Sequence, residues 1–349
     1  MTKINSTLGG KKVISTLEMP EIKNSHIYVL TDKEKEDLNQ LIHSIKLDLN
    51  QLDHYTLNQL ERESYKLPEK VVDHLISFKR QKNRYGTILF RNLPTDEELP
   101  NTPDDGKAPK NKKENVSELL LYLFMLHLGE PIGYADEKNG QIIHDICPIK
   151  GKETNLENSG SQVFFTYHTE DAIHPHKPDY LSLVCLRSDH EQKAKTETAS
   201  IVQALELLPG YAIDLLRKPL YRLSPPSSFN SPELSTQTSV LSGNIIQPNL
   251  CIHGSLMQGV NAEAQWALEE LKKALAEVSS GVVLTPGDLI IIDNHLAAHA
   301  RTAFTPKYDG KDRWLQRMFV VVDFNKSSAS RSIKSHVCMP LKIELELQK

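Results

Sequence analysis

Apolar residues recur every three or four positions in two segments of the first third of the chain. Leu38 and Ile42 lie in the first segment, which follows Thr31, and the second segment follows Pro68. This spacing places apolar side chains on one face of a helix, and threonine and proline are favoured at helix starts. Two helices are therefore predicted here, and the apolar stretch 117–128 predicts a third, packed on the back of a sheet.

Beyond residue 84 the pattern changes to short apolar runs separated by turn residues. The first run is 84–91 and a further helix is predicted over 261–276. The other strand candidates lie near His144, Phe164, Leu181, Ile201, Leu220, Leu250, Val282 and Leu289. Many short strands between turns, with helices gathered early and around residue 266, favour a mainly β protein with flanking helices and an antiparallel jelly-roll core.

No internal repeat is visible, so one catalytic domain over residues 1–349 is expected, with 1–84 as a helical buttress and 85–324 as the jelly-roll core. Residues 101–115 combine two prolines, two aspartates and four lysines, which predicts a mobile surface insertion. The long polar stretch 222–247 predicts either disorder or a lid over a ligand.

Composition excludes some classes without deciding the function. The 349 residues are 39% hydrophobic and 25% charged, which is ordinary for a soluble protein. The net charge of −4, from 41 basic and 45 acidic residues, provides no field that attracts nucleic acid. No apolar run reaches the ~18 residues of a membrane-spanning helix and no signal-peptide core follows Met1, so a cytoplasmic protein is expected.

The four cysteines are scattered along the chain and form no C-x-x-C pair. They are Cys147, Cys185, Cys251 and Cys338. This arrangement argues against a zinc ribbon or a disulfide framework, and each cysteine is most simply a small buried apolar residue.

The candidate chemistry centres on His168, Glu170 and the distant His299. Two imidazoles and one carboxylate can bind iron(II) on one face and leave three positions open. On an extended strand, side chains two residues apart point to the same side, so His168 and Glu170 can reach one ion. The H-x-E triplet alone is a weak signal, but His299 follows a buried apolar strand at 287–294, as a ligand from a second strand should.

Plainer interpretations exist for each residue. Glu170 can be a paired surface acid and His299 a core histidine. Arg313 and Arg317 can be strand-end charges, although the planar guanidinium of Arg313 is also suited to clamping a carboxylate. His295 is a competing ligand, because it lies on the same face as His299 if the strand continues.

Longer stretches of the chain resemble the clavaminate synthase-like iron(II)/2-oxoglutarate dioxygenases, a family that includes asparagine, arginine and lysine hydroxylases. The matching segments occur in order and at sensible spacing, within roughly residues 85–324. They are 129–140, 168–180, 184–187, 287–294, 299–304 and 308–317. The resemblance implies a double-stranded β-helix core of the cupin kind.

The resemblance also implies roles for individual residues. His168, Glu170 and His299 match the iron ligands, with 2-oxoglutarate and O₂ completing the iron's coordination. Arg313 matches the arginine that binds the distal carboxylate of 2-oxoglutarate, and Thr196 matches a threonine that assists it. The implied reaction couples decarboxylation of 2-oxoglutarate to succinate and CO₂ with hydroxylation of an unactivated carbon.

For the substrate, the resemblance implies a free L-α-amino acid held at both ends. Glu137 matches the amine-binding position, Arg317 the arginine that contacts the carboxylate, and Asn158 a polar residue beside the amino acid backbone. The segment 248–254 lacks the aspartates that bind the guanidinium in the arginine hydroxylase, which disfavours arginine. Overall likeness favours the L-lysine 4-hydroxylases, hence L-lysine at C4, with L-lysine, arginine or asparagine 3-hydroxylation as alternatives.

Some points stay open. A lysine ε-ammonium needs acceptors, for which Glu233 and Asn249 are candidates. A metal-free jelly-roll ligand-binding module and a zinc hydrolase are rival classes, and Arg313 argues against the second. A small-molecule substrate is expected, without nucleic acid or membrane partners. The N-terminal helices offer a surface for a homo-oligomer, but Leu38 and Leu41 can equally pack on the core.

Overall fold

The computed structural model describes residues 26–49, 52–156, 160–226, 234–332 and 335–342. Asn158 and Glu233 therefore lie outside the described residues. No helix in these ranges is both long and apolar enough to cross a membrane.

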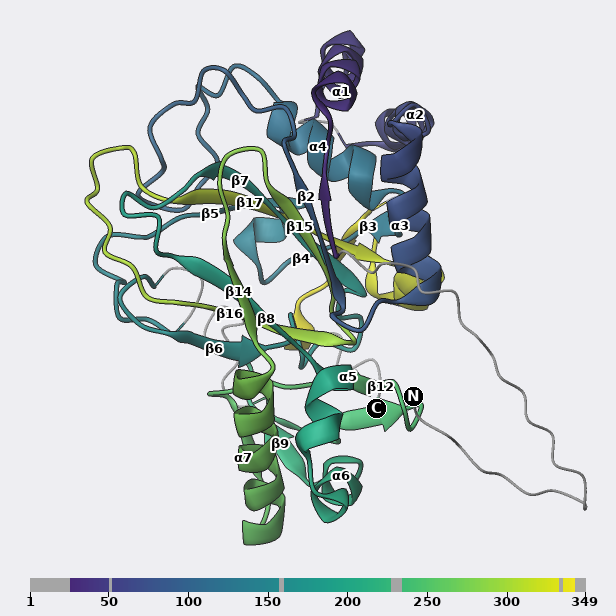
Figure 1. Ribbon diagram of the computed structural model, residues 1–349, viewed down its shortest axis with the longest axis vertical. Coiled ribbons are helices and arrows are strands. Elements are labelled where there is room, and N and C mark those ends of the chain that lie inside the picture. Colours follow the sequence, from purple (N-terminus) through teal and green to yellow (C-terminus); the bar gives the residue numbers. More distant parts are fainter. Residues whose placement is uncertain (1–25, 50–51, 157–159, 227–233, 333–334, 343–349) are drawn as a thin grey trace, which may run out of the picture.

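Seven strands form one large sheet (Figure 1). Its order is β1 (Ile27–Val29), β2 (Thr87–Arg91), β15 (Leu289–Asp293), β7 (Tyr180–Arg187), β17 (Trp314–Val321) and β3 (Glu130–Pro131), with β5 (Ile143–Ile146) also paired to β17. All pairs are antiparallel except β1 with β2. The central strands β15, β7 and β17 are almost entirely buried, because both faces of this sheet are covered.

Four strands form a smaller sheet that faces the large one. They are β14 (Ser280–Val283), β8 (Lys195–Ser200), β16 (Ala297–Arg301) and β6 (Phe165–His168). A buried apolar cluster lies between the sheets and includes Leu183, Ile292, Phe319 and Ala297. Two facing antiparallel sheets confirm the predicted jelly roll with flanking helices.

Four helices cover the outer face of the large sheet (Figure 1). They are α1 (Asp32–Ser44), α2 (His54–Ser64), α3 (Glu69–Gln81) and α4 (Val116–Met125). Thr31 caps α1 as predicted, whereas α2 was not predicted. Leu38 is fully buried against this sheet and Leu41 packs beside it, so both residues contribute to the core. An oligomer through these helices stays a prediction.

A second group of elements packs against the small sheet, at the lower end of Figure 1. It contains α5 (Ile201–Ala204), α6 (Gly210–Leu216), α7 (Ala262–Glu277), β9 (Tyr221–Leu223), β10 (Thr236–Thr238), β11 (Leu241–Gly243), β12 (Pro248–Leu250) and β13 (Met257–Gly259). The strand expected at Ile201 is wrong, because Ser200 ends β8 and its hydroxyl caps α5. Asn261 caps α7, close to the predicted start of that helix.

Short elements complete the described chain. They are β4 (Gly133–Tyr134), β18 (Val337–Cys338), and the 3₁₀ helices η1 (Lys138–Gly140), η2 (Leu205–Leu207) and η4 (Phe324–Ser330). Part of the predicted lid, 227–233, lies outside the described residues, while β9, β10 and β11 occupy its flanks. The lid and the division into buttress and core stay predictions. None of the four cysteines, all within the described residues, forms a disulfide; three are buried and Cys251 is half-buried.

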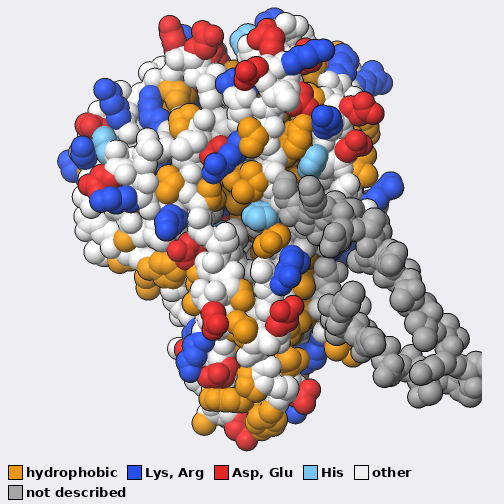
Figure 2. Space-filling view, viewed as in Figure 1, with side chains coloured by type: hydrophobic (Ala, Val, Ile, Leu, Met, Phe, Trp, Pro, Cys, Tyr) orange, Lys and Arg blue, Asp and Glu red, His pale blue; other side chains and the backbone are white. Residues whose placement is uncertain are grey.

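Charged side chains of both signs are interspersed over the face of the described residues that Figure 2 shows. Hydrophobic side chains gather at the lower end of this face, where α6 and α7 lie. Tyr211 and Trp266 are exposed on these two helices and their rings stack with centroids 6.0 Å apart.

The segment 101–115 has neither helix nor strand, but it is anchored to the core rather than only lying on the surface. The Lys112 ammonium lies 2.7 Å from Asp96 and 2.6 Å from Glu118, and its side chain is 5% exposed. Asp96 also accepts hydrogen bonds from the first backbone amides of α4, at Val116 and Ser117. Lys112 therefore neutralises Asp96, which binds the start of α4, and Glu118 in the first turn of that helix.

Lys112→Met should lower the free energy of unfolding by about 3–5 kcal/mol, because it leaves two largely buried carboxylates without their cation. Lys113→Met is the matched control, because the Lys113 side chain is 74% exposed in its pair with Glu98. The control should change stability by about 0.5 kcal/mol or less. Urea unfolding of both variants makes the comparison, and equal stabilities would contradict the anchoring role of Lys112.

Candidate active site

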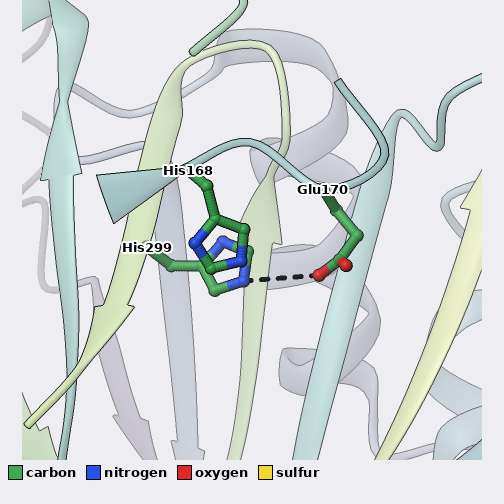
Figure 3. A group of neighbouring side chains, drawn as sticks. All are labelled: His168, Glu170 and His299. Atoms are coloured by element: carbon green, nitrogen blue, oxygen red, sulfur yellow. Dashed lines mark ion pairs between the residues drawn. The ribbon is translucent and has the colours of Figure 1, made fainter. Parts of the chain in front are cut away.

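His168, Glu170 and His299 point toward one another in the space between the two sheets (Figure 3). His168 ends β6, and His299 lies directly opposite it on β16 in the antiparallel register. One ligand atom from each of the three residues lies within 4.8 Å of the others, and all three residues are buried. The predicted triad is therefore brought together.

Glu170 reaches this cluster from a turn rather than from a strand, which corrects the expected geometry, because β6 ends at His168. Asn294 fixes that turn. Its side-chain oxygen accepts a hydrogen bond from the Glu170 backbone N–H at 2.7 Å, and its amide donates to the Glu170 carbonyl at 3.0 Å. Sequence analysis gave Asn294 no role, although an asparagine directly after an apolar strand was a visible signal.

Hydrogen bonding and burial prepare the three side chains for a divalent ion. The Thr166 carbonyl lies 2.8 Å from Nδ1 of His168, so Nε2 faces the cluster, where it has no hydrogen-bond partner among the described residues. Oε2 of Glu170 is likewise buried without a hydrogen-bond partner among them, 3.4 Å from Nε2 of His299. Such orphaned ligand atoms fit a metal, and two imidazoles with one carboxylate fit iron(II).

The pKa directions agree with metal binding, which needs neutral imidazole and ionised carboxylate. Burial, with the neighbouring His299, lowers the pKa of His168 well below its ordinary value. Burial alone would raise the pKa of the Glu170 carboxyl, but Arg317 and His299 hold it below its ordinary value.

His295 is not part of the cluster. It lies in the turn between β15 and β16, and its Nε2 binds the carboxylate of Asp179. The strand does not continue through it, so the competing assignment is wrong.

A small buried pocket of about 40 Å³ adjoins His299. Its lining includes Thr196, Arg301 and Arg313, and none of the described residues contributes a carboxylate to it. Nη2 of Arg313 donates to the Thr196 hydroxyl at 3.3 Å, and Arg313 is 5% exposed. A buried guanidinium that faces a pocket without an acid suits an anionic group, in agreement with the predicted pairing of Arg313 and Thr196.

Arg301 is a residue that sequence analysis missed. Its guanidinium donates to the carbonyls of Gly160 at 2.6 Å and Val163 at 3.1 Å. These contacts fasten the segment that leads into β6. The available signal was its position two residues after His299, on the same face of β16.

A larger cavity of about 910 Å³ is lined in part by His168 and Glu170, and its lining also includes Glu137 and Arg317. Nη1 of Arg317 lies 2.8 Å from Glu170, and Nη2 lies 3.3 Å from Glu137. Burial raises the pKa of the Glu137 carboxyl to about 7 despite this guanidinium. The structure therefore brings two predicted substrate residues next to a predicted metal ligand.

Two other predicted contacts are not seen. Asn158 is outside the described residues. Asn249 is exposed on β12 and is absent from the described cavity lining, which contradicts its proposed contact with a substrate. His253 does line the cavity, with its ring centroid 5.3 Å from that of His168. The sequence analysis gave this histidine no role, although it lies in the segment 248–254.

Comparison with known proteins shows the family to which this fold and site belong. Residues 56–319 match the family described as taurine catabolism dioxygenase TauD, TfdA family. L-asparagine oxygenase of Streptomyces coelicolor is 36% identical over 266 residues, covering 75% of this chain and 79% of that protein. L-lysine 3-hydroxylase of Catenulispora acidiphila is 30% identical over 322 residues, covering 90% and 88%.

Solved structures that resemble this chain are also iron-dependent oxygenases. Asparagine oxygenase in complex with Fe(II), 2S,3S-3-hydroxyasparagine and succinate aligns with a TM-score of 0.85 and 31% identity, over 90% of this chain and 99% of that one. The non-heme iron oxygenase OrfP in complex with Fe and alpha-ketoglutaric acid aligns with a TM-score of 0.80 and 32% identity, over 90% and 99%.

The chain belongs to the TauD/TfdA family and is an iron(II)/2-oxoglutarate-dependent dioxygenase. This excludes the metal-free module and the zinc hydrolase. The expectation of greatest likeness to the L-lysine 4-hydroxylases is wrong, because those of Flavobacterium johnsoniae and Chitinophaga pinensis are 29% and 28% identical, against 36% for asparagine oxygenase.

Mn²⁺ is a substitute for Fe²⁺ that is not readily oxidised by air. It should raise the thermal midpoint of unfolding of the wild-type protein, because it binds the native state. His299→Ala should abolish the increase. His295→Ala, the matched control, should keep it even if its own midpoint is lower. Differential scanning fluorimetry with and without the metal distinguishes the two variants. Loss of the shift in His295→Ala alone would show that His295, and not His299, is the metal ligand.

Arg313→Lys should raise the KM for 2-oxoglutarate by about 10- to 100-fold, because lysine cannot donate two parallel hydrogen bonds to a carboxylate. Thr196→Val should raise it by a smaller factor of about 2- to 10-fold, because it removes a single hydroxyl hydrogen bond and leaves the guanidinium in place. Succinate formation measured against 2-oxoglutarate concentration gives both values. Arg84→Lys, on the exposed surface, should leave the KM unchanged.

Proposed function

We propose that this enzyme hydroxylates a free L-α-amino acid at C3. The observation that carries the proposal is the position of Arg317, which contacts both Glu170 and the half-buried Glu137. A guanidinium and a carboxylate side by side are complementary to the carboxylate and ammonium of an α-amino acid. Clavaminate synthase 2 of Streptomyces clavuligerus, asparagine oxygenase and the lysine and arginine hydroxylases among the relatives are consistent with such a substrate.

The same contact favours C3 over more distant carbons. With its α-carboxylate on Arg317 and its α-ammonium on Glu137, the substrate has its α-carbon close to the metal ligands. C3 is one bond further along and is the first side-chain carbon to come within reach. Relatives named as 3-hydroxylases or β-hydroxylases support this choice of carbon.

The chain's own residues have separate tasks in this reaction. His168, Glu170 and His299 would hold iron(II), while Arg313 and Thr196 would orient the distal carboxylate of 2-oxoglutarate. When bound, iron and 2-oxoglutarate supply the oxidation of an unactivated C–H bond, with succinate and CO₂ as co-products. Arg317 and Glu137 orient the amino acid, and the burial of the triad keeps bulk water away from the reacting carbon.

The described lining beyond these residues favours a neutral polar side chain, such as the carboxamide of L-asparagine. His253, Ser255 and Asn155 offer neutral donors and acceptors, and Lys152 adds a positive charge. Of the acids in that lining, Asp136 and Asp145 already accept hydrogen bonds from other parts of the chain.

L-lysine at C4, giving 4-hydroxylysine, is the second candidate. Lysine hydroxylases that act at C3 and at C4 are among the relatives. An acceptor for the ε-ammonium would have to come from a carboxylate such as Glu233, as predicted from the sequence.

The test is succinate formation by anaerobically iron-loaded protein given 2-oxoglutarate and O₂, screened against the 20 common free amino acids with product mass. We expect one amino acid to gain one oxygen, with NMR locating it at C3. An oxygen at C4 of lysine would support the second candidate. Substrate-independent succinate with no hydroxylated amino acid would reject the free amino acid proposal.

A further inference from the structure

Asp171, which follows Glu170, is a buried carboxylate to which the functions above assign no role. It is 7% exposed and lines the large cavity, and its Oδ2 accepts no hydrogen bond from the described residues. Its backbone φ is 47°, in the left-handed region that aspartate tolerates better than most residues with a side chain. A buried unpaired oxygen costs folding free energy, so a partner from outside the chain is expected.

Asp171 lies at the end of the cavity where the substrate amine is proposed to bind. One carboxylate oxygen from each of Glu137, Glu170 and Asp171 lies within 4.8 Å of the others. An ammonium group carries three N–H donors, so two carboxylates can share it.

The charges around this carboxylate cluster also call for a cation. Within the described residues, Arg317 is the guanidinium that contacts it. The ammonium of Lys138 is directed elsewhere, to the carbonyls of Gly106 at 2.7 Å and Asp145 at 3.3 Å. Iron would bind Glu170, which leaves the carboxyl groups of Glu137 and Asp171 and the incoming substrate carboxylate around the Arg317 guanidinium.

We propose that Asp171 and Glu137 together bind the α-ammonium group of the substrate. This inference rests on the proposed function and makes it more specific. A substrate must present a free, charged α-amine, because acylation removes the charge and leaves only one N–H donor. N-acylated amino acids and residues within a peptide are thereby excluded as substrates.

Asp171→Asn is the test variant, because it removes the charge at constant size and asparagine also tolerates positive φ. Calorimetric titration of the anaerobic protein, loaded with iron and 2-oxoglutarate, measures binding without turnover. The probes are L-asparagine and L-lysine, each paired with the analogue that lacks the α-amine, succinamate and 6-aminohexanoate. Asp309→Asn, an exposed carboxylate outside the described cavity lining, is the control.

We expect Asp171→Asn to bind the amino acid at least tenfold more weakly and to bind its des-amino analogue within twofold of wild type. The control should match wild type for both ligands. Equal affinity of Asp171→Asn and wild type for the amino acid would overturn the proposal. Equal weakening of both ligands, or loss of iron from the variant, would also overturn it by showing a structural or metal-binding role.

If Asp171→Asn does not fold, Asp171→Gly replaces it, because glycine adopts positive φ without strain. Failure of the proposed function would give a different result. In that case the wild-type protein itself would bind none of the 20 common amino acids. If only the role of Asp171 is wrong, the wild-type protein still binds and converts its amino acid.

Discussion

The antiparallel pairing of β6 with β16 is the constraint on which the site depends. It places His299 opposite His168, and in the same sheet β8 places Thr198 against the other side of His299. Backbone hydrogen bonds thus set the separation of two ligands that are 131 positions apart in the sequence. The third ligand needs a separate device, because β6 has already ended, and Asn294 supplies it by tying the Glu170 turn to the end of β15.

Strand β17 supports the substrate side of the site in a comparable way. Arg317 faces inward over the ring of Phe319, with its guanidinium carbon 4.4 Å from the ring centroid. The neighbouring Gln316 faces outward and donates to Glu118 of α4 at 2.8 Å and to Asp145 at 3.1 Å. The strand that carries the arginine is therefore fixed on both faces, so the guanidinium is positioned before any ligand arrives.

Much of the site was readable from the sequence because its signals are local. Residue type and spacing identified His168, Glu170 and His299, and the resemblance led to Arg313 and Arg317. What escaped depends on tertiary contacts. Asp171 matters because it lies in a left-handed turn close to the carboxylate of the distant Glu137, and Arg301 because it reaches the carbonyls of another segment. The fold shows the same division: the cap at Thr31 marked the start of α1, whereas at Ile201 a serine cap prevailed over a β-branched residue.

Arg317 projects from a central strand, whereas Asn155, Ser224 and Ser255 of the cavity lining lie in connecting segments. Loops accept substitution and insertion more readily than paired strands do. Mutation can therefore reshape this part of the cavity lining while leaving Arg317, His168 and His299 in register. Such an arrangement lets one scaffold acquire new substrates without rebuilding its reaction centre, and it identifies these loops as the place to begin when the enzyme is redesigned for a different amino acid.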